Sequence, residues 1–159
     1  MARELNVALI GYKFMGKAHS HAYRDVDFFF PSECKAVMKV ICGRNQTPLR
    51  EAAQAWGWQE CETSWQAVVE RDDIDIVDIA SPQNTHRDIA VAAAKAGKHV
   101  LLEKPMALDE GEAREMLDAV REAGVKHMVV FNYRRVPAVA FARRLIDEGK
   151  IGRIFHFRG

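Results

Sequence analysis

The chain has 159 residues, with 23 lysines and arginines against 22 aspartates and glutamates, and a formal net charge of +1. Hydrophobic residues make up 48% of the sequence, which excludes intrinsic disorder and allows one hydrophobic core. The near-neutral charge provides no long-range attraction to nucleic acid or to an anionic membrane, so we expect neither as a partner.

Short apolar runs, which predict strands, alternate along the chain with longer helical patterns. In chain order we expect a strand at 5–10, a helix at 14–24, a strand at 37–42, helices at 48–56 and 64–70, a strand at 74–80, a helix at 85–96, a strand at 99–102, a helix at 109–123, a strand at 127–131 and a helix at 137–148. Asp109 and Glu112 have the spacing of a capping box, and Gly97, Gly124 and Gly149 each follow a predicted helix end. Near-continuous apolar strands separated by helices indicate an α/β fold, a doubly wound parallel sheet of the Rossmann type with helices on both faces.

Two segments depart from this alternation. Residues 25–35 are expected to form an irregular connection in which Phe28, Phe29 and Phe30 pack locally. Residues 152–158 alternate polar and apolar side chains, which is typical of a half-buried strand.

The N-terminus and the cysteines favour a cytoplasmic location. Residues 1–6 include Glu and Asn where a signal peptide has an apolar run, and no apolar stretch approaches the ~20 residues of a membrane-spanning helix. The three cysteines are irregularly spaced, so we expect reduced thiols. His19 and His21 face different directions on a helix, and we expect no metal site.

The segment after the first strand has the form of a phosphate-binding turn. Gly11 and Gly16 occupy the first and third glycine positions of the dinucleotide motif G-x-G-x-x-G, with Lys13 in the middle one. The N–H groups at the start of the next helix can then hold a phosphate. The same glycines followed by Lys17 also fit the NTPase loop G-x-x-x-x-G-K-[ST], although Ala18 replaces the hydroxyl residue that holds Mg²⁺. Both nucleotide classes stay open at this point.

The end of the second predicted strand bears on the cofactor. Folds that prefer NAD place an acidic residue there to bind the ribose 2′-hydroxyl, whereas this chain has Gly43, Arg44 and Asn45. Arg44 can meet a 2′-phosphate, so the sequence favours NADP over NAD.

Three further motifs follow predicted strands: Ala80-Ser81-Pro82-Gln83-Asn84-Thr85-His86, Glu103-Lys104-Pro105-Met106 and Phe131-Asn132-Tyr133-Arg134-Arg135. Together with the glycine turn they resemble the Gfo/Idh/MocA oxidoreductase family (glucose-fructose oxidoreductase and inositol dehydrogenase), in the family's order and across essentially the whole chain. Within the family, these segments most resemble the sugar and polyol dehydrogenases of the levoglucosan-dehydrogenase type.

The resemblance implies hydride transfer between a CH–OH group of a sugar or cyclic polyol and NAD(P). It implies that Lys104 lies near the reacting carbon and orients or helps deprotonate the substrate hydroxyl. Glu103 is expected to bind the cofactor ribose or to orient this lysine, and Gln83 stands where the family more often has Asn. The cofactor contacts expected from all these segments are Gly11, Tyr12, Lys13, Phe14, Met15, Gly16, Arg44, Ser81, Pro82, Asn84, His86, Glu103, Lys104, Pro105, Asn132 and Arg134.

The resemblance also implies a second α/β domain, which is absent from this chain. We expect residues 1–135 to form the NAD(P)-binding domain, and 136–159 to be the connecting helix and first strand of a truncated substrate and oligomerisation domain. The Asp and His that partner the lysine on a helix of the family's second domain have no counterpart here. We therefore expect cofactor binding with little turnover by this chain alone, and a homo-oligomer for the full-length protein. The alternative is a non-catalytic regulatory module that binds a dinucleotide.

Overall fold

The computed structural model describes residues 3–158. Its six strands form one sheet in the order β3-β2-β1-β4-β5-β6. The strands are β1 (Arg3–Ile10), β2 (Cys34–Cys42), β3 (Glu60–Glu62), β4 (Ile76–Ile79), β5 (His99–Glu103) and β6 (His127–Val130). The helices are α1 (Phe14–Phe29), α2 (Gln46–Trp56), α3 (Trp65–Val69), α4 (His86–Lys95), α5 (Glu110–Glu122) and α6 (Pro137–Asp147), with 3₁₀ turns η1 (Gln83–Thr85) and η2 (Asn132–Arg135).

The central strands run parallel and end level with one another. Ile10 of β1 lies opposite both Cys42 of β2 and Ile79 of β4, and Ile79 lies opposite Leu102 of β5. The loops that follow these four strands therefore leave the sheet at one edge. The strand order reverses between β1 and β4, which is the place where doubly wound sheets bind their ligands.

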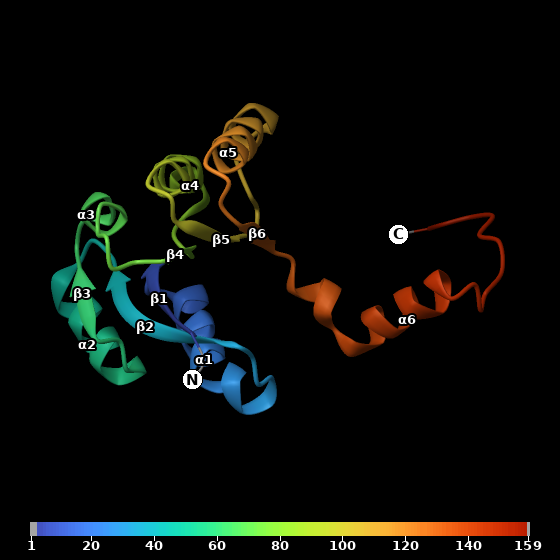
Figure 1. Ribbon diagram of the computed structural model, residues 1–159, viewed down its shortest axis with the longest axis horizontal. Helices are drawn as coiled ribbons and strands as arrows, with labels where there is room; N and C mark the ends of the chain where they lie inside the picture. The colour runs from blue at the N-terminus through green and yellow to red at the C-terminus, as the bar shows by residue number, and fades with distance from the viewer. Residues whose placement is uncertain (1–2, 159) are drawn as a thin grey trace. The chain divides into compact units, whose positions relative to one another are not determined.

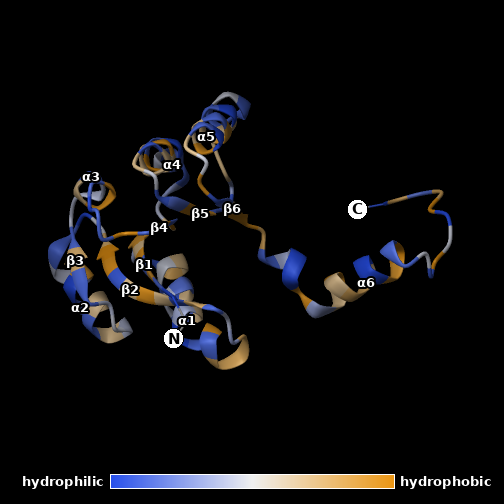
Figure 2. Cartoon of the chain, viewed as in Figure 1, coloured by the Kyte–Doolittle hydropathy of each residue, from blue (hydrophilic) through white to orange (hydrophobic). Residues whose placement is uncertain are grey.

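Helices cover both faces of the sheet, as Figure 1 shows: α1 and α2 lie on one face, and α3, α4 and α5 on the other. Two clusters of buried side chains separate these layers, one including Leu49 of α2 and the other Ile89 of α4 and Met116 of α5. Figure 2 shows the same arrangement as apolar strands between helices of mixed polarity. The predicted α/β architecture is confirmed.

The predicted capping box at the start of α5 is also confirmed. The carboxylate of Asp109 accepts a hydrogen bond from the Glu112 N–H (2.9 Å), and Glu112 Oε2 accepts one from the Leu108 N–H (2.9 Å). Both bonds satisfy N–H groups at the start of α5 that have no partner within the helix.

Three details of the sequence prediction are wrong. Helix α1 continues to Phe29 rather than ending at residue 24, because no residue before Pro31 interrupts it. Phe28 and Phe29 therefore lie in the helix and not in a loop, although their exposed rings do contact each other edge to face, with 5.0 Å between their centres. The short edge strand β3 was not predicted, since three residues are too few to show a pattern. Residues 152–158 form no strand. Alternating polar and apolar residues favour an extended segment, but a strand also needs a hydrogen-bonded neighbour, and none of the described strands pairs with this segment.

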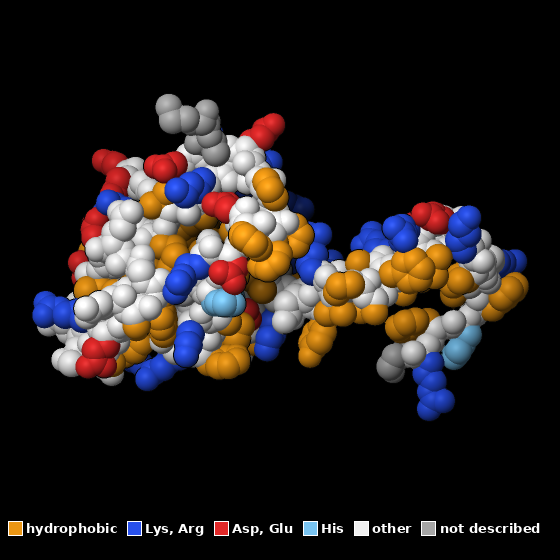
Figure 3. Space-filling view, turned by 90° about the horizontal axis from the view of Figure 1, so that it is seen from below, with side chains coloured by type: hydrophobic (Ala, Val, Ile, Leu, Met, Phe, Trp, Pro, Cys, Tyr) orange, Lys and Arg blue, Asp and Glu red, His pale blue; other side chains and the backbone are white. Residues whose placement is uncertain are grey.

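The chain divides into two compact units, Met1–Val129 and Val130–Gly159. The second unit holds η2 and α6, and no residue of α6 is buried. Figure 3 shows apolar side chains gathered along this helix, among them the exposed Val139, Phe141 and Ile146. The domain boundary expected at residue 135 stays a prediction. Within residues 3–158 no helix is long and apolar enough to cross a membrane.

Candidate dinucleotide-binding site

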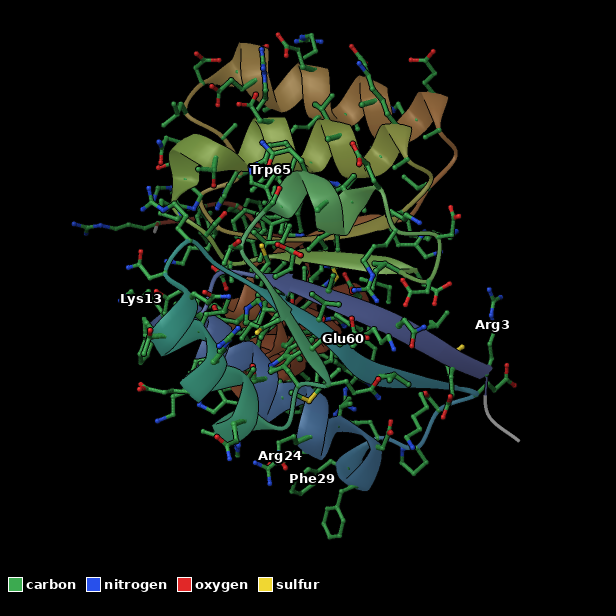
Figure 4. All side chains as sticks on the ribbon, turned by 90° about the vertical axis from the view of Figure 1, so that its left-hand side faces the viewer. Arg3, Lys13, Arg24, Phe29, Glu60 and Trp65 are labelled. Atoms are coloured by element: carbon green, nitrogen blue, oxygen red, sulfur yellow. The ribbon has the colours of Figure 1, made fainter. Side chains whose placement is uncertain are left out.

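The candidate site lies at the sheet edge where β1, β2, β4 and β5 end. The Gly11 N–H donates to the Cys42 carbonyl (2.9 Å), and the Ala80 N–H donates to the Ile10 carbonyl (2.9 Å), so the first loops after these strands are joined by backbone hydrogen bonds. Figure 4 shows Lys13, which follows β1, at the opposite end of the sheet from Arg3, where β1 begins.

The glycine turn is packed so tightly that two positions exclude any side chain. Gly11 has φ of +115°, and a Cβ atom there would lie 2.5 Å from the Ala80 carbonyl oxygen. A Cβ atom at Gly16 would lie 2.0 Å from the Gly11 carbonyl oxygen. Both glycines thus allow close backbone packing, of the turn against the loop after β4 and of the start of α1 against the turn, as the first and third glycines of the dinucleotide motif do.

The start of α1 is prepared for an anion. Lys13 is the N-cap residue, no side chain caps the helix, and no acidic residue lies in its first turn. The side chains of Lys13, Phe14 and Lys17 are exposed, and Met15 is half-buried. Helix N–H groups and two nearby ammonium groups favour a bound phosphate, which fits the donor set that a dinucleotide needs.

The turn after β2 touches the glycine turn through Tyr12. A Cβ atom at Gly43 would lie 2.2 Å from the Tyr12 ring, and the Lys13 ammonium lies 5.3 Å from the centre of the same ring. Arg44, the next residue, is exposed. Arg44 therefore follows a residue that packs against the glycine turn, and positions 43–45 hold no acidic residue.

The segment after β4 is tied to the segment after β5. The His86 ring is 1% exposed, with Nδ1 3.0 Å from the Pro105 carbonyl oxygen and Nε2 2.9 Å from that of Ser81. Gln83 Nε2 donates to the Ala107 carbonyl (2.5 Å). Of the other residues expected to contact the cofactor here, Pro82 and Asn84 are exposed and Ser81 is half-buried. The buried His86 ring thus links the loop after β4 to the loop after β5.

Glu103 is buried at the end of β5, and both of its carboxylate oxygens have protein partners. Oε2 accepts a hydrogen bond from the Lys104 N–H (2.9 Å), and Oε1 lies 3.2 Å from His19 Nε2. Lys104 and Pro105 are exposed, and the bond between them is cis. Of the two roles expected of Glu103, this geometry fits orientation of Lys104 better than binding of the ribose.

Sequence reasoning missed the buried polar cluster below this edge. His19 Nδ1 lies 2.9 Å from Asp78 Oδ2, and the Tyr23 hydroxyl donates to the same oxygen (2.9 Å). Burial lowers the pKa of His19, but the hydrogen bonds and charges of Asp78 and Glu103 outweigh it and raise the pKa to about 9. Burial and the charge of Asp78 raise the pKa of Tyr23. The available signal was Asp78, one of two aspartates in the predicted strand 74–80.

The remaining predicted contacts, Asn132 and Arg134, lie in η2 of the second unit. Both are exposed, and the Arg134 guanidinium lies 5.5 Å from the centre of the Phe131 ring. Within residues 3–158, no group of three His, Cys, Asp or Glu side chains is arranged to hold a metal ion.

A parallel sheet of this strand order, with a glycine turn and an uncapped helix at its switch point, defines a Rossmann dinucleotide-binding domain. Residues 5–131 match the model of the oxidoreductase family with an NAD-binding Rossmann fold, and the chain belongs to this family, Gfo/Idh/MocA. The match decides between the two nucleotide classes that the glycine turn left open.

Several curated relatives are named as sugar or polyol dehydrogenases. The chain is 49% identical over 158 residues to levoglucosan dehydrogenase of Pseudarthrobacter phenanthrenivorans, covering 99% of this chain and 40% of that protein. It is 32% identical over 160 residues to scyllo-inositol 2-dehydrogenase (NAD⁺) of Bacillus subtilis, covering 100% and 45%. A solved levoglucosan dehydrogenase in complex with NADH is 48% identical and superposes with a TM-score of 0.93, covering 96% of this chain and 41% of that one. The chain thus spans less than half the length of these relatives.

Proposed function

We propose that this chain provides the cofactor site and one catalytic residue of an enzyme that transfers hydride between a sugar or cyclic polyol and a nicotinamide dinucleotide. The observation that carries the proposal is the meeting, at one sheet edge, of the glycine turn after β1 and the Glu103–Lys104–Pro105 segment after β5. The names of the relatives support the substrate class, because levoglucosan dehydrogenase has also been solved with NADH and levoglucosan together.

The residues of the turn suit the diphosphate of the cofactor. Gly11 and Gly16 allow the tight packing of the turn, and the uncapped N–H groups that begin α1 can bind the diphosphate, with the exposed Lys13 beside them. Tyr12, Phe14 and Met15 complete the turn. Beyond it, Ser81, Pro82 and Asn84 line the loop after β4, while Asn132 and Arg134 are proposed to border the nicotinamide and the substrate.

Lys104 is proposed as the catalytic residue. Its side chain is exposed at the sheet edge, while its backbone N–H is held by the buried carboxylate of Glu103. An amine in this position can hydrogen-bond the substrate hydroxyl and accept its proton. The bound nicotinamide ring supplies the hydride acceptor.

Arg44 is proposed to set the choice of cofactor. Arg44 is exposed and follows Gly43, which packs against Tyr12, so its guanidinium can donate to a 2′-phosphate on the adenosine ribose, and positions 43–45 hold no carboxylate that would repel it. We therefore propose that the domain accepts NADP more readily than NAD. Self-association of the full-length protein and a cytoplasmic location rest on the family resemblance and on composition.

A chimaeric enzyme tests the proposed activity. Residues 5–131 would replace the matching domain of the Pseudarthrobacter levoglucosan dehydrogenase, and reduction of NAD⁺ and NADP⁺ would be followed with levoglucosan, D-xylose and scyllo-inositol. We expect turnover of at least one sugar or polyol, and a loss of about 10²-fold or more in kcat for Lys104→Ala. Lys95→Ala, on the exposed end of α4, is the matched control and is expected to retain full activity. A folded chimaera that binds cofactor and oxidises none of them would favour the regulatory module instead.

A further inference from the structure

The ring of His19 joins three elements below the sheet edge. It extends from α1, three residues after Gly16, and its side chain is 11% exposed. Its Nδ1 atom lies 3.0 and 2.9 Å from the two carboxylate oxygens of Asp78, on β4, and its Nε2 atom lies 3.2 Å from Oε1 of Glu103, at the end of β5. The helix that begins at the glycine turn is thereby fastened to the two strands that precede the candidate cofactor and catalytic loops.

Two carboxylates around one imidazole favour a charged ring. A neutral imidazole has one N–H, so one of its nitrogens would present a lone pair to a carboxylate oxygen. The imidazolium form donates from both nitrogens. Asp78 is fully buried and Glu103 is 4% exposed, so water cannot replace a missing donor.

The contact continues from Glu103 to the backbone of Lys104. With Oε1 held by His19, the carboxylate has a fixed plane, and Oε2 is directed at the Lys104 N–H (2.9 Å). Rotation of the carboxylate would break both bonds together. The orientation of the peptide group that carries Lys104 therefore depends on a ring that belongs to the dinucleotide-binding helix.

We infer that His19, as an imidazolium between Asp78 and Glu103, is a positioning residue for Lys104 and couples the cofactor-binding helix to it. The inference rests on the proposed function in taking Lys104 as the catalytic residue. The groups that face the ring are Asp78 from β4 and Glu103 from β5, and the Tyr23 hydroxyl from its own helix faces Asp78. The pKa of His19, raised to about 9, keeps the ring charged at neutral pH despite the opposing effect of burial.

Nuclear magnetic resonance of the cofactor-free chain tests this coupling without requiring any activity. The ring nitrogens of His19 and the backbone amide of Lys104 would be followed between pH 6 and 10.5. We expect an imidazolium at pH 7, and a Lys104 amide shift that titrates with the same midpoint as the ring. A neutral His19 ring at pH 7, or a Lys104 amide that stays constant while the ring titrates, would overturn the inference. This test of the coupling between His19 and Lys104 needs only the unsubstituted chain.

A pair of matched variants adds a functional readout. His19→Gln removes the charge and one donor, while His21→Gln makes the same change two residues along on an exposed ring that faces only Asp25. We expect the Lys104 amide titration to vanish in H19Q and to persist in H21Q. NADH affinity of the unsubstituted chain is expected to fall severalfold between pH 7 and 10, and that of H19Q to stay within twofold; equal pH dependence in both would count against the coupling. Absence of both NADH and NADPH binding by the unsubstituted chain would instead refute the proposed function.

Discussion

The carbonyl oxygen of Gly11 and the α-carbon of Gly16 are in such close contact that a Cβ atom at position 16 would lie 2.0 Å from the oxygen. Gly16→Ala must therefore displace backbone rather than a side chain. We expect the free energy of unfolding to fall by about 1–3 kcal/mol, measured by urea denaturation, and NADH affinity to fall by more than tenfold as the turn opens. Gly111→Ala in α5, whose new Cβ would approach only the movable Asp109 carboxylate at 3.2 Å, is the control and should bind NADH normally.

Stability should depend on pH through His19. Its pKa is about 9 in the folded chain and 6.5 as the ordinary value, so the folded state binds the proton more tightly. The stabilisation is complete below pH 6.5 and is lost as the pH rises through 9. We expect the free energy of unfolding to fall by roughly 1–3 kcal/mol across this interval. Urea denaturation at several pH values should show this slope in the unsubstituted chain and in H21Q, and a shallower one in H19Q. The same slope in H19Q would assign the pH dependence to another group.

Arg44 should distinguish the two nicotinamide cofactors. If its guanidinium meets the 2′-phosphate, the unsubstituted chain binds NADPH more tightly than NADH. Arg44→Ala should then weaken NADPH binding about five- to tenfold and leave NADH affinity within twofold, because an exposed charge-assisted contact is lost. Fluorescence titration with both cofactors measures this, with Arg50→Ala on α2 as the control. Equal affinities, or tighter NADH binding, before any substitution would refute the proposed preference.

Asp109 should stabilise the start of α5. Asp109→Ala leaves the Glu112 N–H without its acceptor, and we expect a loss of about 1 kcal/mol in the free energy of unfolding. Asp118→Ala, an exposed change in the middle of the same helix, should alter stability by less than about 0.5 kcal/mol. A comparable loss in both variants would show that the hydrogen bond at the N-cap contributes nothing particular.

The architecture was predictable where the pattern of apolar side chains is regular over a whole strand or helix. The strand around Leu9 and the helix around Ile89 show their buried faces directly in the sequence, and the capping pair Asp109 and Glu112 marks a helix start that the structure confirms. The edge strand β3 and the extension of α1 past residue 24 were not predictable in this way, because neither has a distinctive apolar period.

The candidate site was predictable in its turns and not in its interior. The glycines of the turn and the Glu103–Lys104–Pro105 segment are patterns of neighbouring residues, so they can be recognised in the sequence. The contact between His19 and Asp78 joins residues 59 positions apart, and the two meet only because the fold brings side chains of α1 to β4. One acidic residue within an apolar strand run indicates that a buried partner is needed, but not which residue provides it.

Calorimetric titration of the chain with NADH tests the central claim most directly. If the glycine turn and the start of α1 form the binding site of a nicotinamide dinucleotide, NADH should bind saturably at one site per chain, and Gly16→Ala should weaken that binding by more than tenfold. ATP with Mg²⁺ should bind far more weakly, because Ala18 provides no hydroxyl for the metal. No saturable binding of NADH or NADPH, together with tight Mg²⁺-dependent binding of ATP, would contradict the account.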